Sequence, residues 1–468
     1  MRRLAWRLVP CHRRIFLPAR GFIPRLPRYI PRWSLIPFRS TTSSSDGYPD
    51  FVYQPIEDVE RQPGGYHPIH IGDELNNRYR VVHKLGHGAY STIWLSRDEQ
   101  HGAYVAIKVG TGDASPCEAD LLRRITEGTH SGNPGLSMIP KVRERFEIPG
   151  PNGHHRCYVT VPAQSSVSAA LFCRHFQVET ARALAAQLVL AVSCLHFQGV
   201  VHGDIHLGNV LIRFSASLDE LSIEQFYEKF GKPDTEPVIR LDGQPLPPNV
   251  PSHGTTPVWL GKRANEIPPE EAHLLLSDFG ESFSPSNPQH QRRGEDCHTP
   301  LPVAPPEAYF EPTKLLSFPA DIWALACAMW SIFGMRSLFD ATLATLDYMA
   351  SQQIDILGQL PPEWWEAWEA RHKYFEKIEE PKKGRFVYPS LEQSFEKYVQ
   401  ASRQRDGMGC FDDGEKRAIL DMLRPMLAFK PEERATAEDV LGSDWMVNWG
   451  LPAAERISLS EAGVMAMH

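Results

Sequence analysis

The sequence predicts an α+β fold, with strands in the N-terminal half of the folded region and helices in the C-terminal half. Apolar residues alternate along 79–95 and again along 104–109, which is the period of half-buried strands. An apolar helix is predicted from Ala320 onward. With 42% hydrophobic and 23% charged residues, the 468-residue chain has a globular composition, which excludes a disordered, collagenous or coiled-coil protein.

The first 45 residues differ sharply from the rest of the chain. They contain ten Arg and no Asp, Glu or Lys, and they end in a run of Ser and Thr. This composition is typical of a mitochondrial transit peptide, and the alternative is a basic leader without an address. The remainder is acidic, which disfavours non-specific binding of nucleic acid and suits a basic partner. Since no run of about 18 apolar residues occurs, no membrane-spanning helix is expected.

A glycine-containing turn joins the first two predicted strands. Gly86-His-Gly-Ala-Tyr-Ser91 carries two glycines, which allow backbone N–H groups to approach a phosphate closely. By itself such a sequence is more often only a turn. The next strand carries Lys108, a point charge suited to phosphate oxygens, and Glu118 in the helix predicted at 118–125 could pair with it. The alternatives are that Lys108 is only an edge-strand lysine and that Glu118 is only a solvated acid.

Two polar loops follow apolar segments further along the chain. His202-Gly-Asp204, with Asn209 five residues after the aspartate, places a carboxylate and an amide in one tight loop. Such a pair suits a base at a substrate hydroxyl and a ligand of a metal ion. Asp278, followed by Phe and Gly, ends the buried strand predicted at 274–277 and has the form of a Mg²⁺-binding carboxylate. Each loop alone could be a structural turn, but their order after the glycine turn and the lysine strand indicates phosphate chemistry.

Three further residues are predicted to be structural. Glu307, in Ala-Pro-Pro-Glu, and Arg434, far along the chain, would form a buried ion pair. Asp321 opens the apolar helix and would hold the loop that contains Asp204 from below.

In this order the motifs resemble those of eukaryotic protein kinases, over roughly residues 65–450. Gly65-Tyr-His-Pro68, Ser91-Thr-Ile-Trp-Leu95 and Ala320-Asp-Ile-Trp323 narrow the resemblance to the SR-protein kinases, as a divergent member of fungal type. That family phosphorylates serines in Arg/Ser-rich proteins. The resemblance implies a two-lobed protein kinase fold, ATP and Mg²⁺, and a protein substrate for a monomer that binds no nucleic acid directly. It also implies the nucleus or cytoplasm as the alternative to mitochondria.

The resemblance also divides the chain into parts. The expected parts are the leader 1–45, an N-terminal extension 46–77, an N-terminal lobe 78–162, a C-terminal lobe 163–450 and a tail 451–468. A long insert within the C-terminal lobe, 214–270, separates Asn209 from Asp278, where kinases usually have a short strand pair. The insert is expected to begin with a helix at 218–230 and to follow an extended surface path through its Pro-rich middle, 245–257.

Each site residue receives a role from the resemblance. Asp204 would be the catalytic base, Asn209 and Asp278 would hold Mg²⁺, and Lys108 would hold the α- and β-phosphates against Glu118. Thr160 would lie at the back of the adenine pocket. The residues expected around the nucleotide are Leu85, Gly86, His87, Gly88, Ala89, Tyr90, Ser91, Ile93, Ala106, Lys108, Glu118, Thr160 and Pro162.

Three positions depart from the kinase pattern. Ser91 replaces the third Gly of the turn, as in the SR-protein kinases. Gly203 replaces the Arg before the catalytic Asp, so the cation that would bind a phosphorylated activation loop is missing and no such switch is expected. His206, counted among the catalytic residues, replaces a Lys, and a neutral imidazole brings no full charge.

Two alternatives to a protein kinase follow from the departures. His206 and the short gap before Glu118 favour a pseudokinase that binds ATP or a partner without turnover. The loop from His202 to Asn209 also resembles that of aminoglycoside and choline kinases, which favours a small-molecule kinase. The complete set of Lys108, Asp204, Asn209 and Asp278 opposes the first alternative, and the Glu307 and Arg434 motifs oppose the second.

Two clusters late in the chain allow more than one interpretation. Trp364, Trp365 and Trp368 lie one helical turn apart, which favours core packing over a peptide-docking surface. The other cluster is the acidic start of a helix, expected to be solvated: Asp412, Asp413 and Glu415.

Overall fold

The computed structural model describes most of the chain from residue 65 onward. All described residues fall within one compact unit, Val52–His468. The predicted targeting segment, 1–45, lies outside them. The described ranges are 65–114, 117–128, 132–172, 174–215, 217–238, 245–246, 250–342, 345–378 and 380–457.

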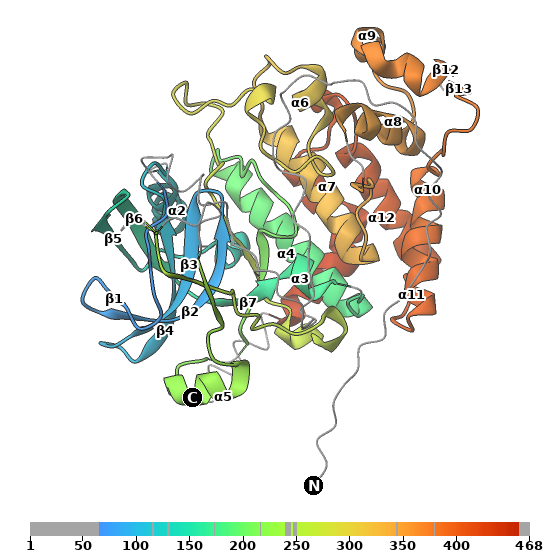
Figure 1. The fold of residues 1–468 in the computed structure, drawn as a ribbon. Helices are drawn as coiled ribbons and strands as arrows, with labels where there is room; N and C mark the ends of the chain where they lie inside the picture. Colours follow the sequence, from blue (N-terminus) through green and yellow to red (C-terminus); the bar gives the residue numbers. More distant parts are fainter. Residues whose placement is uncertain are drawn as a thin grey trace, which may run out of the picture. The chain divides into compact units, whose positions relative to one another are not determined.

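The first part of this unit is a six-stranded antiparallel sheet, called the sheet lobe below (Figure 1). Its strands follow the order β1-β2-β3-β4-β6-β5. Because side chains alternate between the two faces of a strand, the apolar residues of β4, including Val105, Ile107 and Val109, are buried. The bounds are β1 Glu74–Leu75, β2 Tyr79–Gly88, β3 Ser91–Asp98, β4 Ala103–Gly110, α2 Cys117–Glu127, β5 Glu144–Gly150 and β6 Gly153–Thr160.

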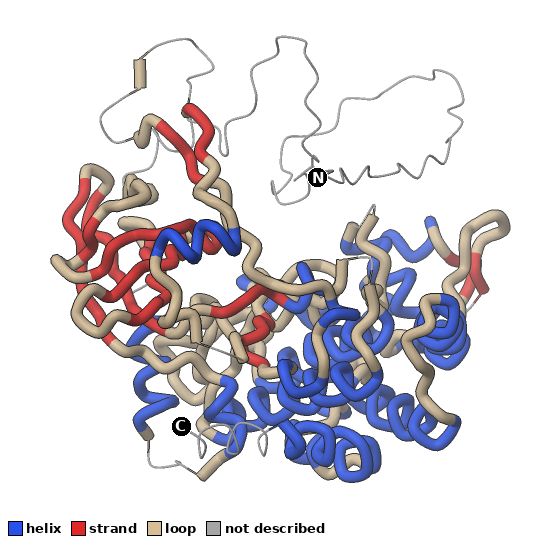
Figure 2. The backbone as a smooth tube through the Cα atoms, turned by 90° about the horizontal axis from the view of Figure 1, so that it is seen from below, coloured by secondary structure: helices blue, strands red, loops and turns tan. Residues whose placement is uncertain are grey.

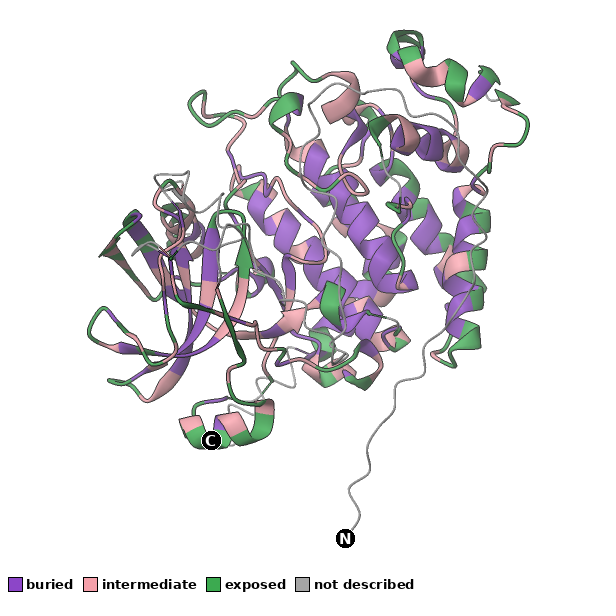
Figure 3. Ribbon diagram, viewed as in Figure 1, coloured by how far each residue is buried: buried purple, intermediate pink, exposed green. Residues whose placement is uncertain are grey.

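Helices dominate the remaining chain, called the helical lobe below; Figure 2 shows most of them gathered apart from the large sheet. Helices α4 and α7 are buried along most of their length (Figure 3). Helix α4 is long and apolar enough to cross a membrane, but 72% of its apolar window is buried inside the fold, as in a core helix. The bounds are α3 Val167–Ala170, α4 Val178–Phe197, α6 Pro306–Phe310, α7 Phe318–Gly334, α8 Leu346–Leu357, α9 Pro362–Ala367, α10 Leu391–Ser394, α11 Ala401–Arg405, α12 Asp413–Met426 and α13 Ala437–Leu441, with the strand pair β12 Phe375–Lys377 and β13 Glu380–Pro381.

A small sheet at the start of the helical lobe brings two of the predicted loops together. Its order is β11-β8-β7, and Val210 of β8 lies opposite Leu276 of β11. The residues just before β8 and just after β11 therefore meet, and the Ser277 N–H donates to the Asn209 carbonyl at 2.8 Å. The bounds are β7 Ala163–Ser166, β8 Val210–Arg213 and β11 Leu274–Leu276.

The insert predicted between β8 and β11 has a shorter helix than expected. Helix α5, Ile223–Phe230, begins five residues later than the prediction of 218–230, which is wrong in its start. The cause is Ser222, whose side chain accepts from the Gln225 N–H and caps the helix. In the Pro-rich stretch, β10 (His253–Thr255) pairs with β9 (Thr235–Pro237).

The insert is anchored on the sheet lobe rather than only lying on the surface. The Tyr227 hydroxyl donates to the Val82 carbonyl at 3.0 Å, and Asp219 Oδ1 accepts from the Tyr104 N–H at 2.6 Å. A shared apolar cluster supports these bonds, so the insert bridges the two lobes. Its buried members from the insert are Leu218, Phe226 and Leu260, and those from the sheet lobe are Val82, Leu95 and Tyr104.

The structure confirms the prediction for the tryptophan cluster and contradicts part of the prediction for the acidic cluster. The three tryptophans are buried, which confirms core packing: Trp364, Trp365 and Trp368. The prediction of a solvated acidic start is wrong for Glu415, which is fully buried, although Asp412 and Asp413 are exposed. Glu415 accepts from Arg182 of α4 at 2.8 Å and from the Trp445 indole at 3.2 Å, and these partners offset the cost of burying its charge.

Candidate catalytic and nucleotide site

Lys108 lies on β4 and binds two carboxylates. Its Nζ is 2.7 Å from Glu118 Oε1 and 2.8 Å from Asp278 Oδ1, although Asp278 follows it by 170 residues. Burial would lower the pKa of Lys108, but the two carboxylates outweigh burial and hold the pKa well above its usual value. The site therefore contains a permanent cation between two acids.

Glu118 connects helix α2 with the segment that follows β11. Besides Lys108, its Oε1 accepts from the Tyr158 hydroxyl at 3.1 Å and from the Phe279 backbone N–H at 3.0 Å. The interaction of Glu118 with Lys108, predicted despite the short gap before α2, is thus present. Tyr158 was not predicted, although the alternation of β6 places its side chain on the same face as Thr160.

Asp278 has an unusual backbone conformation for a residue other than glycine. Its φ of 64° lies in the left-handed region, which is costly unless neighbouring contacts impose it. The bond from Lys108 is such a contact. Burial raises the pKa of Asp278 and the lysine lowers it, with a net shift below the usual value, so the group is a carboxylate. Its side chain is 49% exposed and remains accessible to a ligand.

Asp204 and Asn209 lie in one loop and contact each other. Asn209 Nδ2 donates to the Asp204 carbonyl at 3.0 Å and to Asp204 Oδ2 at 3.1 Å. The other carboxylate oxygen, Oδ1, is buried and has no hydrogen-bond partner within the described residues. A buried acceptor without a partner is costly, so this oxygen has an unused capacity to accept a hydrogen bond.

His206 faces the same carboxylate. Its Nε2 is 3.5 Å from Asp204 Oδ2, and its Nδ1 is 3.1 Å from the Gly208 N–H. Since a ring nitrogen that accepts from a backbone N–H carries no proton, Nδ1 is the unprotonated nitrogen in this arrangement. The imidazole is therefore held by the loop that it belongs to.

Asp321 supports the loop from helix α7, as predicted. Its carboxylate accepts from the backbone N–H groups of His202 at 2.7 Å and Gly203 at 2.9 Å, and it lies 3.0 Å from His196 Nε2. Burial raises the pKa of Asp321, but the hydrogen bond and charge of His196, the charge of His202 and the Gly203 N–H together outweigh burial, and the pKa is below the usual value. The hydrogen bonds confirm the predicted structural role.

The residues predicted around the adenine come from three adjacent strands. Ile93 lies opposite Lys108 across β3 and β4, and Ala106 lies opposite Thr160 across β4 and β6. The Thr160 hydroxyl donates to the Lys141 carbonyl at 3.1 Å. Two further residues predicted around the nucleotide lie outside these three strands. Pro162 lies between β6 and β7, and Leu85 packs against the apolar cluster shared with the insert.

The predicted glycine turn joins β2 and β3. Gly88 pairs with Ser91 in the last register step, and the two residues between them form the tip. The turn residues other than Ser91 are accessible: His87, Gly88, Ala89 and Tyr90 are exposed, and Gly86 is half-buried.

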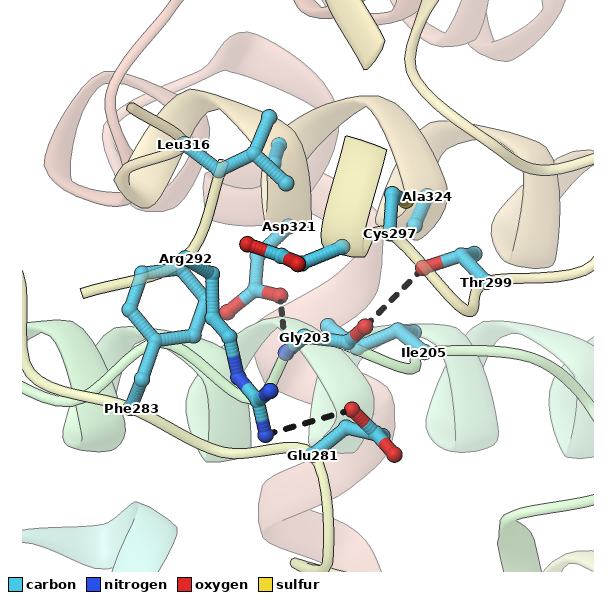
Figure 4. Close-up of a pocket in the computed structure, with 12 residues that line it drawn as sticks. Gly203, Ile205, Glu281, Phe283, Arg292, Cys297, Thr299, Leu316, Asp321 and Ala324 are labelled. Atoms are coloured by element: carbon cyan, nitrogen blue, oxygen red, sulfur yellow. Dashed lines mark hydrogen bonds and ion pairs between the residues drawn. The ribbon is translucent and has the colours of Figure 1, made fainter. Parts of the chain in front are cut away.

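Gly203 lies where the segment after Asp278 passes the loop with Asp204 (Figure 4). Its φ is 80°, and a Cβ atom there would be 2.7 Å from the Glu281 carbonyl oxygen. A side chain is therefore excluded by backbone conformation and by space. The close approach explains why the Arg of the family's pattern cannot occupy this position without a shift of the segment that carries Glu281.

The segment after Asp278 is held by hydrogen bonds and ion pairs. The Thr299 hydroxyl donates to the Gly203 carbonyl at 2.9 Å. Arg292 and His298 both approach Glu281, at 3.5 and 3.0 Å (Figure 4 shows the first pair). Glu281 was not predicted, because no local pattern marks it.

Glu307 and Arg434 form the predicted buried ion pair. Both guanidinium Nη atoms are 2.8 Å from a carboxylate oxygen, and the two side chains are 7% and 0% exposed. Arg434 also donates to the carbonyls of Ala428, Phe429 and Pro319. The pair ties the end of the segment that begins at Asp278 to the C-terminal helices, and the prediction is confirmed.

Removal of one partner of the Glu307–Arg434 ion pair should destabilise the fold. We expect Glu307→Gln to lower the free energy of unfolding by about 3–5 kcal/mol, because a buried guanidinium loses its counter-charge. Urea denaturation followed by circular dichroism measures this change in the free energy of unfolding. The matched control is Glu392→Gln, which breaks the exposed pair with Arg424 and should cost less than about 1 kcal/mol. Equal costs in the two variants would contradict the assignment of the buried pair.

Comparisons with known proteins agree with this architecture. A crystallised kinase domain superposes with a TM-score of 0.53 at 18% identity, over 81% of this chain and 98% of the other. A serine/threonine protein kinase of Aspergillus fumigatus is 26% identical over 415 residues, which cover 83% of this chain and 90% of that protein. A Physarum polycephalum protein named serine/threonine-protein kinase SRPK is 25% identical over 82% of this chain and 89% of its own length. This chain has the protein kinase fold, and proteins named SR-protein kinases are among its sequence relatives.

Shorter matches extend this SR-protein kinase relationship. Human SRSF protein kinase 3 is 32% identical over 158 residues, which are 32% of this chain and 28% of the human protein. No family model matches the chain. The fold class and the predicted resemblance to SR-protein kinases are thereby confirmed, whereas the role of each site residue stays a prediction.

Proposed function

We propose that the chain is an ATP-dependent protein serine/threonine kinase of the SR-protein kinase type. The observation that carries the proposal is the convergence of Lys108, Glu118 and Asp278 beside the loop that holds Asp204 and Asn209. Each group is the residue type that phosphoryl transfer requires at that point of the fold. Two relatives that are named serine/threonine kinases match this chain over most of their own length and support the proposal.

The residues of the site fit Mg²⁺ and ATP. Asp278 and Asn209 offer two hard oxygen ligands, and Mg²⁺ is usually held by one or two protein oxygens while phosphates and water supply the rest. Lys108 offers a permanent cation for phosphate oxygens. Bound Mg²⁺–ATP would supply the phosphoryl group and offset its charge.

The chain's own residues would then prepare the acceptor. Asp204 presents Oδ1, the buried acceptor without a partner, to the proton of a substrate hydroxyl. Asn209 fixes the other oxygen of the same carboxylate. His206, whose Nε2 lies 3.5 Å from Asp204 Oδ2, would stand beside that carboxylate where the family's pattern has a Lys.

The substrate class follows from charge and relationship together. Outside the first 45 residues the chain is acidic, which favours a basic peptide over an acidic one. We infer a protein substrate with serines among arginines, inside the cell.

A transfer assay on the full chain tests the proposal. Labelled Mg²⁺–ATP is offered with an Arg/Ser peptide, with a general basic protein substrate and with a small amino alcohol. Transfer to the Arg/Ser peptide above the other two is expected. Binding of ATP without transfer to any acceptor would overturn the proposal in favour of a pseudokinase, and transfer to the amino alcohol alone would indicate a small-molecule kinase.

We expect full activity without phosphate on the segment between Asp278 and Glu307. Gly203 offers no cation to such a phosphate, and Thr299 and Arg292 already hold the segment through unmodified groups. Phosphatase-treated protein should keep its rate within about twofold of mock-treated protein. Mass spectrometry confirms that phosphate has been removed, and a fall of about tenfold or more would contradict the expectation.

A further inference from the structure

The tip of the glycine turn is held from outside by a residue of the N-terminal extension. The Tyr66 hydroxyl lies 2.6 Å from the Gly88 carbonyl oxygen and 3.0 Å from that of Ala89, and these two acceptors share its single proton. The next carbonyl, that of Tyr90, accepts from the Thr111 N–H at 2.9 Å. Two donors from outside the turn, the Tyr66 hydroxyl and the Thr111 N–H, therefore hold three successive carbonyls of the turn.

Tyr66 itself is fixed on the sheet lobe by its own backbone neighbours. Asn152 Nδ2, from the β5–β6 hairpin, donates to the Tyr66 carbonyl at 2.7 Å. The Gly112 N–H, just beyond β4, donates to the Gly65 carbonyl at 3.1 Å. Ile69 is buried in the apolar cluster of the sheet lobe. The extension is thus anchored independently of the bond that its tyrosine makes to the turn.

The geometry of the peptide bond gives these contacts a consequence. In a trans peptide the C=O and the following N–H point in opposite directions. Donors that fix the carbonyls of Gly88 and Ala89 therefore also fix the N–H groups of Ala89 and Tyr90, which point away from Tyr66. N–H groups of this kind form the cradle that a glycine turn offers to phosphate. A cradle that is already ordered loses less conformational entropy when a ligand binds.

We propose that Tyr66 is a positioning residue for the nucleotide, since its hydroxyl holds the glycine turn in the conformation that receives the phosphates. The inference rests on the proposed function, because it takes the glycine turn as the phosphate cradle. The Gly65-Tyr-His-Pro68 segment, to which no role in the site had been assigned, would then take part in nucleotide binding.

The test is Tyr66→Phe in the full chain, which removes the hydroxyl and keeps the ring. The matched control is Tyr227→Phe, which removes a tyrosine hydroxyl bound to the carbonyl of Val82 on the same strand, β2, away from the turn. Three measurements are compared: hydrogen exchange of peptides that cover 86–92 without nucleotide, Mg²⁺–ATP affinity by calorimetric titration, and the kinetic constants for ATP and peptide.

For Tyr66→Phe we expect faster exchange in the turn and Mg²⁺–ATP affinity weaker by about two- to tenfold, the range for one lost hydrogen bond. The KM for ATP should rise by the same factor, with kcat and the KM for peptide within about twofold. Tyr227→Phe should change none of these. Unchanged exchange, or faster exchange with unchanged or tighter ATP binding, would overturn the proposal.

Failure of the proposed function gives a different result. If the parent binds Mg²⁺–ATP but transfers no phosphate, exchange and calorimetry still decide the role of Tyr66. If the parent binds no nucleotide, both proposals are overturned together.

Discussion

Asp204→Asn should lower phosphotransfer by about a hundredfold or more and leave the fold intact, because it removes a general base. In the parent, Oδ2 accepts from Asn209 and the buried Oδ1 has no partner. The amide of an asparagine replaces one of these acceptors with a donor. If the amide nitrogen faces Asn209, two donors meet; if it faces the substrate, it cannot accept the hydroxyl proton.

Initial rates with labelled ATP and an Arg/Ser peptide measure this loss, and thermal melting checks the fold. Asp421→Asn, the same chemical change at an exposed pair with Arg424, should keep the parental rate. Mg²⁺–ATP affinity of Asp204→Asn should stay within about threefold of the parent, since the residue acts on the acceptor. A variant as active as the parent would remove Asp204 from the chemistry.

Lys108→Met should lower phosphotransfer by about a hundredfold or more, the effect of removing one preorganised electrostatic group from a phosphoryl-transfer site. The lysine is the cation that Glu118 and Asp278 share, at 2.7 and 2.8 Å. Methionine keeps an unbranched side chain, one atom shorter, but leaves the two carboxylates facing each other without a positive charge. Phosphate oxygens would then meet net negative charge.

Calorimetric titration with Mg²⁺–ATP and initial rates separate binding from chemistry in this variant. Lys108→Arg keeps the charge but changes the shape of the donor, and we expect it to recover little of the rate. Lys377→Met, at a lysine that is 80% exposed on β12, is the control for the loss of a lysine and should behave like the parent. Parental binding and turnover by Lys108→Met would show that the pocket lies elsewhere.

The sequence by itself determined strands β2, β3, β4 and β11, helix α7 and the order of the motifs. Alternation along β3 and β4 and the apolar run of α7 are local patterns, so one short window contains enough information to predict them. The residue types at 108, 204, 209 and 278 indicated phosphoryl transfer for the same reason, since each motif is short and its chemistry is specific. Where a local signal was overlooked, as at Ser222 before α5, the predicted helix began too early.

Only the tertiary structure decided which distant residues meet. The bond between Lys108 and Asp278, the burial of Glu415 against Arg182, the anchoring of the insert on the sheet lobe and the bond from Tyr66 to the glycine turn all join separate parts of the chain. A solvated acid and a buried, paired acid have the same local sequence, because the difference lies in whether another element supplies the counter-charge. The left-handed backbone of Asp278 and the space that excludes a side chain at Gly203 are likewise set by neighbours that arrive only on folding.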